Sequence, residues 1–195
     1  CHSIEHKLGI HASPTCTMLY GEGTVEGEEP GAVGFLIGDE NRGLACMFTM
    51  MNNARLMVGM EGVGLADAAY DKALAYARER RQGRATRLAP DAEKAGSMSP
   101  ILAHPDVART LLTMKGLTDA ARAIAFNCAI ATDRARAHAT SDAEKAGLWQ
   151  ERANLLTPVA KAFATDVACE VASLGIQVHG GMGFVEGTGA ARLLR

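Results

Sequence analysis

The sequence predicts a mainly α-helical protein, a bundle of long helices preceded by the last strands of a β-domain. After residue 39, apolar residues recur at steps of three and four over long stretches, which is the spacing of one helix face. Before residue 39, two short runs of β-forming residues lie next to proline and glycine. The chain of 195 residues is 48% hydrophobic without a low-complexity tract, enough for the core of one domain and part of another. We therefore expect a β-domain to end in residues 1–38 and a helical domain to occupy residues 39–195.

Two strands are expected in the first of these regions. One covers residues 15–20 and follows a proline, and the other covers residues 32–37 and is flanked by glycines. The segment between them, residues 21–31, is rich in Gly and Glu and is typical of a turn or loop.

The first helix is predicted over residues 44–81. Its apolar residues recur at helical steps: Leu44, Met47, Met51, Ala54, Val58, Leu65, Ala69 and Leu74. Gly59, Gly62 and Gly64 lie in its middle, and each costs about 1 kcal/mol relative to alanine in a helix. These glycines therefore indicate close packing of the helix backbone against a neighbour. A loop over residues 82–103 is expected to follow.

The second helix is predicted over residues 105–138. Pro105 suits the first helical position, where its missing N–H would have no helical partner in any case. Asp106 suits the positively polarised first turn. An apolar stripe then continues through Val107, Leu111, Met114, Leu117, Ala121, Ile124, Cys128 and Ala131.

The third helical region is predicted from Ser141 to residue 175. Ser141 is expected as the N-cap, and Glu144, three residues later, would complete a capping box. Pro158 should kink this helix because proline removes one backbone hydrogen bond. Long helices joined by short connections predict antiparallel neighbours in a bundle.

Charge and cysteine content narrow the classes of function. Lys and Arg number 20 against 22 Asp and Glu, so the net charge of -2 provides no field for nucleic acid or for an anionic membrane surface. No apolar run reaches the roughly 18 to 20 residues of a membrane span. The five cysteines are scattered singly, which favours reduced thiols in a cytoplasmic setting over disulfides or a zinc site.

The basic end of the first helix, Arg78–Arg84, is one candidate binding site. A helix over this segment would place Arg80 and Arg84 on one face. Guanidinium groups bind phosphate oxygens in a bidentate manner, so a pyrophosphate is a natural partner. Cations at a helix C-terminus are also favoured by the helix dipole, and this structural interpretation stays open.

A glycine cluster within Gln177–Phe184 is a second candidate. Its spacing matches neither a dinucleotide-binding fingerprint nor a P-loop, but glycines allow a flat or phosphorylated ligand to approach the backbone. The structural alternative is a helix C-cap at Gly180 followed by a turn. Three N-terminal histidines lack helical spacing and a carboxylate pair, so we expect no metal site; they are His2, His6 and His11.

Four motifs in order carry a resemblance to a known family. They are Gly38–Leu44 (Gly-Asp-Glu-Asn-Arg-Gly-Leu), Asn53–Arg55 (Asn-Ala-Arg), Ala77–Gly83 (Ala-Arg-Glu-Arg-Arg-Gln-Gly) and Gln177–Phe184 (Gln-Val-His-Gly-Gly-Met-Gly-Phe). Their order and spacing resemble the acyl-CoA dehydrogenases, in particular large bacterial members similar to those acting on long-chain or 3-methylmercaptopropionyl thioesters. The resemblance covers essentially the whole chain.

This resemblance implies the end of a middle β-domain followed by a C-terminal helical domain truncated at its end. It implies an FAD-dependent oxidoreductase of fatty acid metabolism that converts acyl-CoA to 2,3-enoyl-CoA and passes electrons to electron-transfer flavoprotein. The implied assembly is a homo-oligomer, a dimer or a dimer of dimers. An acyl-CoA oxidase and a cofactor-free helical interaction module remain as alternatives.

The resemblance also implies roles for particular residues. Arg80 matches an arginine that contacts the FAD pyrophosphate, and Gln82 lies close to a neighbouring flavin-contacting position. The adenine side of FAD would meet the glycine cluster at Gln177, Gly180 and Gly181. The arginine and the glycine cluster are expected to serve the flavins of different subunits. Asn52, where an aspartate is common, and Arg55 are expected near the acyl-CoA.

The catalytic base of most family members lies in a Tyr-Glu-Gly-Thr motif downstream of the glycine cluster, which we expect beyond Arg195. Some relatives place the base in the first long helix, at the position that Ala54 matches here. Glu61 and Glu186 match neither position. We therefore expect this chain to be a fragment without dehydrogenase activity of its own.

Overall fold

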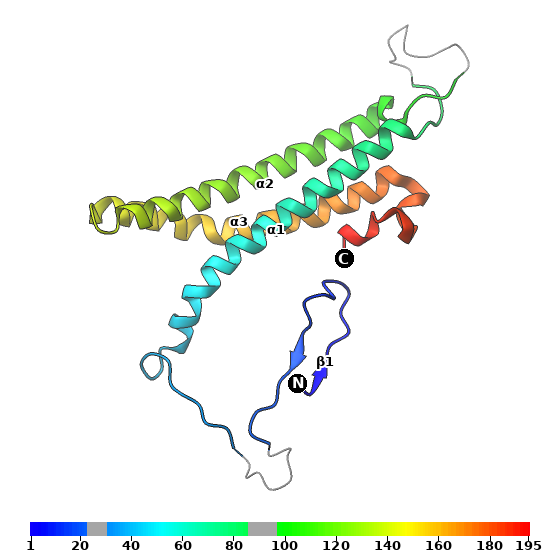
Figure 1. Cartoon of the computed structure of the whole chain (residues 1–195). Helices are drawn as coiled ribbons and strands as arrows, with labels where there is room; N and C mark the ends of the chain where they lie inside the picture. The colour runs from blue at the N-terminus through cyan, green and yellow to red at the C-terminus, as the bar shows by residue number, and fades with distance from the viewer. Residues whose placement is uncertain (23–30, 86–96) are drawn as a thin grey trace. The chain divides into compact units, whose positions relative to one another are not determined.

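Three long helices dominate the computed structural model, which describes residues 1–22, 31–85 and 97–195 (Figure 1). They are α1 (Gly43–Glu79), α2 (Pro105–His138) and α3 (Ala143–His179). The predicted mainly helical fold is confirmed. The described residues form two compact units, one of Cys1–Met50 together with Arg195 and one of Met51–Leu194. The domain boundary at residue 38 stays a prediction.

The first unit contains the two short strands β1 (Ser3–Ile4) and β2 (Cys16–Thr17), which pair antiparallel. The strand predicted at 15–20 therefore forms only over its second and third residues. The strand predicted at 32–37 is wrong, because that segment finds no pairing partner in the described chain and its large apolar side chains are exposed. Much of the predicted loops at 21–31 and 82–103 lies outside the described residues.

In the second unit, α1 continues from Met51 and shares a core with α2 and α3. The core consists mainly of small side chains: Val63, Ala66, Ala69, Ala73, Ala77, Leu111, Met114, Ala121, Ala164, Val167, Val171, Ala172 and Val178. Small side chains allow helix backbones to approach closely. α2 and α3 follow each other through a short turn and lie side by side as antiparallel neighbours, as predicted (Figure 1).

The helix glycines show where α1 crosses α3. A Cβ atom on Gly62 would lie 2.6 Å from the carbonyl oxygen of Ala164, and one on Gly59 would lie 3.1 Å from that of Ala160. Close backbone packing is therefore confirmed at these two glycines. It is wrong for Gly64, which is exposed and would place a Cβ with no atom within 4 Å.

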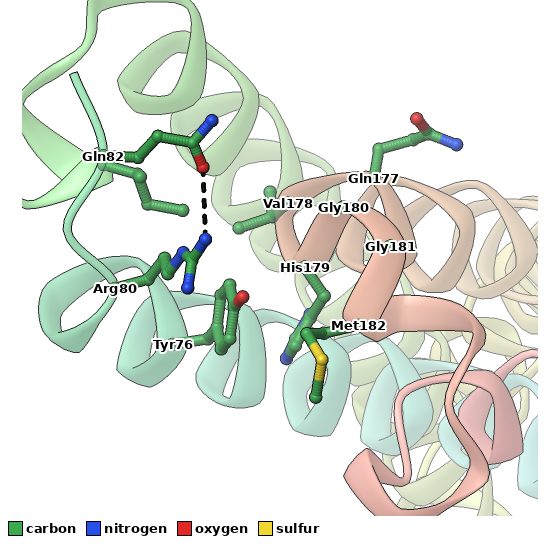
Figure 2. A pocket seen from close by; sticks show the side chains of 10 residues that line it. Tyr76, Arg80, Gln82, Gln177, Val178, His179, Gly180, Gly181 and Met182 are labelled. Atoms are coloured by element: carbon green, nitrogen blue, oxygen red, sulfur yellow. Dashed lines mark hydrogen bonds between the residues drawn. The ribbon is translucent and has the colours of Figure 1, made fainter.

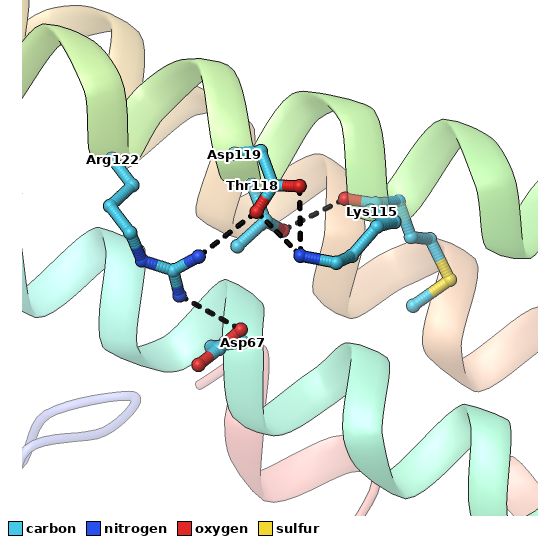
Figure 3. A network of polar contacts seen from close by, with 6 residues as sticks. Asp67, Lys115, Thr118, Asp119 and Arg122 are labelled. Atoms are coloured by element: carbon cyan, nitrogen blue, oxygen red, sulfur yellow. Dashed lines mark hydrogen bonds and ion pairs between the residues drawn. The ribbon is translucent and has the colours of Figure 1, made fainter.

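A charged network joins α1 to α2 in the same unit (Figure 3). Arg122 on α2 reaches Asp67 on α1 at 2.9 Å and Asp119 at 3.0 Å, and Lys115 reaches Asp119 at 2.6 Å. The Lys115 hydrogen bond is the largest cause that lowers the pKa of Asp119. Thr118 is buried beside this network and donates to the carbonyl oxygen of Met114 at 2.8 Å.

The start of α2 follows the sequence prediction. Pro105 occupies the beginning of the helix and Asp106 its first turn. A short 3₁₀ helix, η1 (Ile101–Ala103), directly precedes it. Local sequence signals were sufficient here because proline and an acidic residue both suit the first helical turn.

The start of α3 differs from the prediction. The N-cap is Asp142, whose Oδ1 accepts from the backbone N–H of Lys145 at 3.0 Å. Ser141 was the wrong N-cap, because the side chain that accepts from the first helical turn belongs to the next residue, Asp142. The helix continues through Pro158, which deprives the carbonyl of Asn154 of its helical donor. Asn154 is exposed, so water can replace that donor.

Three short 3₁₀ helices follow α3: η2 (Gly180–Phe184), η3 (Glu186–Thr188) and η4 (Ala191–Leu193). Gly180 caps α3 with φ +59°, as the structural alternative for the glycine cluster proposed. The helix end predicted at residue 175 is wrong, because α3 continues to His179. Lys72 on α1 donates to the carbonyl oxygen of Thr188 at 2.7 Å and ties this segment to the bundle. None of the described helices combines the length and the apolar character that a membrane crossing needs.

Candidate functional site

A pocket of about 330 Å³ lies where the C-terminal ends of α1 and α3 meet (Figure 2). Its lining consists of Tyr76, Arg80, Gln82, Ile101, Gln177, Val178, His179, Gly180, Gly181 and Met182. The five residues predicted to contact a cofactor are all in this lining. Tertiary packing of α1 against α3 thus brings together two motifs that are almost 100 residues apart in the sequence.

Arg80 provides the charge on the α1 side of the pocket. α1 ends at Glu79, but the N–H of Arg80 still donates to the carbonyl oxygen of Tyr76 at 2.8 Å, so its side chain is placed as on a helix. Its Nη2 donates to Oε1 of Gln82 at 3.5 Å, a long hydrogen bond that uses one of five guanidinium N–H groups. The side chains of Arg80 and Gln82 are both exposed and thus accessible to a ligand.

Arg84 does not share this face of α1, contrary to the sequence prediction. The helix has ended before it, and Gly83 adopts φ +64°, which turns the chain away from the helical path. Of these two arginines, only Arg80 lines the pocket.

Backbone hydrogen bonds hold the turn from Arg80 to Gly83 in place. The N–H of Gln82 donates to the carbonyl oxygen of Ser99 at 2.9 Å, and the N–H of Ser99 donates to that of Gly83 at 2.8 Å. The carbonyl of Arg80 accepts from Ile101 at 2.8 Å. This turn is therefore tied to the segment that leads into α2.

Tyr76 and His179 form an aromatic pair in the pocket, and the sequence did not predict this pair. Their ring centroids are 4.5 Å apart with an interplanar angle of 26°. Nδ1 of His179 lies 2.7 Å from the carbonyl oxygen of Gly175, so Nδ1 carries a hydrogen and donates it. Two signals were available: Tyr76 precedes Arg80 by four residues, hence on the same helix face, and His179 lies inside the glycine motif.

The α3 side of the pocket presents backbone. A Cβ atom on Gly180 or Gly181 would meet no atom within 4 Å, so the space beside these residues is open to a ligand. Gly180 needs its positive φ of +59°, which other residues rarely adopt. Gln177 is exposed, and its amide is turned away from Arg80 in Figure 2.

The pocket has a cationic side at Arg80 and an uncharged side at Gly180. Among its lining residues Arg80 is the only Lys or Arg, and none is Asp or Glu. Both α1 and α3 end here, and helix C-termini carry partial negative charge. An anionic group is therefore favoured beside Arg80, while the side at Gly180 suits a neutral group. The pocket fits a ligand with one anionic and one neutral part.

The two residues predicted near the acyl-CoA lie elsewhere. Nη1 of Arg55 donates to Oδ1 of Asn52 at 3.3 Å on α1. Arg55 precedes Arg80 by 25 residues, which corresponds to about 37 Å along the helix axis. The structure thus pairs Asn52 with Arg55 but does not bring them to the pocket. Across the described ranges, no three His, Cys, Asp or Glu side chains are grouped so that they could hold a metal ion.

Residues 41–195 match the sequence family described as acyl-CoA dehydrogenase, C-terminal domain. The chain belongs to the acyl-CoA dehydrogenase family. The resemblance seen in four ordered motifs is therefore confirmed. The helical bundle described above is the family's C-terminal domain.

Curated members of the family match along the whole chain. It is 46% identical over 195 residues to 3-methylmercaptopropionyl-CoA dehydrogenase of Ruegeria pomeroyi, covering 100% of this chain and 30% of that protein. It is 34% identical to a butyryl-CoA dehydrogenase of Syntrophomonas wolfei, covering 98% of this chain and 30% of that protein. The chain thus spans about 30% of the length of these acyl-CoA dehydrogenases.

A solved structure confirms the fold. Butyryl-CoA dehydrogenase of Megasphaera elsdenii superposes with a TM-score of 0.70 at 24% identity, over 98% of this chain and 41% of that chain. A chain from a structure titled electron transferring flavoprotein of Acidaminococcus fermentans has a TM-score of 0.69 at 24% identity, with the same coverage. At this identity the likeness concerns the fold alone.

The geometry does not support the expectation that Arg80 and the glycine cluster serve flavins of different subunits. Both segments line one pocket of a single chain. A single ligand in this pocket would contact both segments, so the pocket gives no support for a second subunit.

Proposed function

We propose that this chain is part of an FAD-dependent acyl-CoA dehydrogenase and that its pocket binds the adenosine diphosphate portion of FAD. The observation that carries the proposal is the meeting of Arg80 and Gln82 with Gln177, Gly180 and Gly181 in one pocket. These are the residues that family resemblance associates with FAD, and nothing in the sequence alone required them to meet.

The residues present fit such a ligand. Arg80 offers a planar fork of donors that matches the oxygens of a pyrophosphate. Gly180 and Gly181 leave room for the adenosine side to approach the backbone. The volume of about 330 Å³ is at the small end for ligand sites, which suits part of FAD rather than the whole cofactor.

The proposed reaction is the oxidation of acyl-CoA to 2,3-enoyl-CoA. It requires removal of the α-proton by a base, and bound FAD supplies the acceptor for the hydride that leaves the β-carbon. The role proposed for this chain is to hold FAD through the pocket and to contact acyl-CoA through Asn52 and Arg55. Glu61 and Glu186 are outside the pocket lining, and we assign no catalytic base among the described residues.

Electron-transfer flavoprotein is the proposed electron acceptor, and a homo-oligomer, either a dimer or a dimer of dimers, is the proposed assembly. Several large apolar side chains on α2 and α3 are exposed, which favours a partner surface on these helices. Among them are Leu112, Phe126, Ile130, Leu148 and Leu155.

The test is the affinity of the full-length protein for FAD after Arg80→Ala. Loss of a charge-assisted hydrogen-bonding group should raise the dissociation constant roughly tenfold to a hundredfold. Arg78→Ala is the matched control, because Arg78 is an exposed arginine in the last turn of α1 that does not line the pocket. The control should bind FAD like the wild type.

The outcomes separate the alternatives. Unchanged FAD affinity in Arg80→Ala would mean that Arg80 does not bind FAD and only interacts favourably with the helix dipole. A wild-type protein without flavin affinity would favour the cofactor-free helical module. Release of hydrogen peroxide, instead of reduction of electron-transfer flavoprotein, would identify an oxidase.

A further inference from the structure

We propose that His104 is a positioning residue for the pocket, acting through the backbone of Gln82. This inference rests on the proposed function. His104 is not in the pocket lining, but its Nε2 lies 2.7 Å from the carbonyl oxygen of Gln82. A carbonyl oxygen only accepts, so Nε2 carries a hydrogen and donates it.

His104 is itself firmly placed at the start of α2. Its N–H donates to the carbonyl oxygen of Ile101 at 3.0 Å, and its carbonyl accepts from Ala108 at 3.0 Å. The side chain therefore extends from an anchored backbone to the turn that contains Arg80. The imidazole also packs against Gly83, where a Cβ atom would lie 3.5 Å from its Cε1.

The hydrogen bond from His104 holds the backbone of Gln82, and the side chain of Gln82 in turn contacts Arg80. The N–H of Gln82 is held by Ser99 at 2.9 Å, and its carbonyl is held by His104, so both backbone polar groups of this residue have fixed partners. The side chain of Gln82 then accepts from Nη2 of Arg80 at 3.5 Å. Loss of the His104 bond would let the peptide between Gln82 and Gly83 rotate, and the Gln82 side chain would then hold the Arg80 guanidinium less firmly.

Three substitutions in the full-length protein distinguish the hydrogen-bond donor of His104 from the packing of its ring. The amide nitrogen of glutamine lies as many bonds from Cα as Nε2 of histidine, so His104→Gln keeps a donor within reach of Gln82. The asparagine amide is one bond shorter, and phenylalanine keeps a ring without a donor. We expect the FAD dissociation constant of His104→Gln to stay within about twofold of wild type.

We expect His104→Phe and His104→Asn to weaken FAD binding by about three- to tenfold, the range for one lost hydrogen bond. FAD titration monitored by flavin fluorescence gives the affinity, and thermal unfolding without flavin reports the fold of each variant. His138→Phe is the control, because His138 lies in the last turn of α2, at the opposite end from His104. It should leave FAD affinity unchanged.

The inference is overturned if His104→Phe and His104→Asn bind FAD like wild type, whatever they do to thermal stability. It is also overturned if His104→Gln loses as much affinity as His104→Phe, since the ring and not the donor would then matter. A wild-type protein that does not bind FAD would instead refute the proposed function, and with it the ligand for which His104 positions Arg80.

Discussion

Single residues decide how closely the helices approach and where charge is available. Arg80 supplies the positive charge in a pocket formed by two helix C-termini, and Gly180 adopts a backbone conformation that side chains disfavour. Gly62 has no Cβ atom at the crossing of α1 and α3, where a Cβ would contact the backbone of α3. Gly64, two residues later, faces open space. The same residue type therefore has opposite consequences at two positions of one helix.

We predict that Gly62→Ala and Gly64→Ala change stability in opposite directions. A Cβ on Gly62 would lie 2.6 Å from the Ala164 carbonyl oxygen, and relieving this contact should cost about 1–3 kcal/mol. Gly64→Ala meets no neighbour within 4 Å and should stabilise the protein by roughly 0.5–1 kcal/mol through helix propensity. Urea unfolding of both variants measures the difference. Equal effects of the two substitutions would contradict the described crossing of α1 and α3.

Among the secondary-structure elements, the ends of the helices form the pocket. The end of α1 continues into the turn that carries Arg80, and the end of α3 continues into the glycine cluster. The start of α2 carries His104, and the start of α3 depends on Asp142. Both the pocket and the proposed positioning of Arg80 are thus properties of helix termini, where backbone groups lack helical partners.

We predict that Asp142 makes the start of α3 sensitive to acid. The backbone N–H and then the side chain of Lys145 lower the pKa of Asp142 below its ordinary value of 3.8. A lowered pKa in the folded state means that the ionised carboxylate stabilises the protein above pH 3.8. This contribution disappears as the pH falls through the lower, folded-state pKa.

Thermal unfolding of wild type and Asp142→Asn at several pH values checks this prediction. Asparagine retains an oxygen that can cap the helix but carries no charge. At pH 7 the wild type should unfold at the higher temperature, and the difference should shrink once the pH falls below 3.8. A difference that stays constant down to the lowest pH would show that ionisation of Asp142 does not contribute.

On the scale of the whole molecule, this chain provides one helical domain and a short stretch before it. It spans about 30% of the length of the two curated acyl-CoA dehydrogenases named above. The pocket near Arg80 and the Asn52–Arg55 pair lie far apart along α1. Most of the length of those relatives lies outside the part that this chain matches.

We predict that the 195-residue chain alone does not oxidise acyl-CoA, even with added FAD. Glu61 lies seven residues from Ala54, about 10 Å along the helix axis from the position used by some relatives. Without a positioned base the rate should fall by roughly 10²- to 10⁴-fold. Anaerobic mixing with FAD and a panel of acyl-CoA thioesters, monitored through flavin absorbance, tests this. Bleaching with any thioester would mean that a carboxylate such as Glu61 or Glu186 acts as the base.

The sequence by itself determined the helices and the family. Helical spacing of apolar residues placed all three long helices, and Pro105 located the start of α2, whereas α3 continues to His179, four residues past its predicted end. These signals are local, because helix hydrogen bonds join residues four apart. Four ordered motifs were also enough to indicate the acyl-CoA dehydrogenases.

Only the tertiary structure decided which residues share a site and which face each residue occupies. It joined Arg80 to Gly180 in one pocket and separated Gly62 from Gly64. It placed Tyr76 and His179 in the pocket lining and His104 against the carbonyl of Gln82. It also left residues 32–37 without a strand partner in the described chain. Contacts between distant segments depend on how helices pack and on which groups find partners, and local sequence patterns do not encode either property.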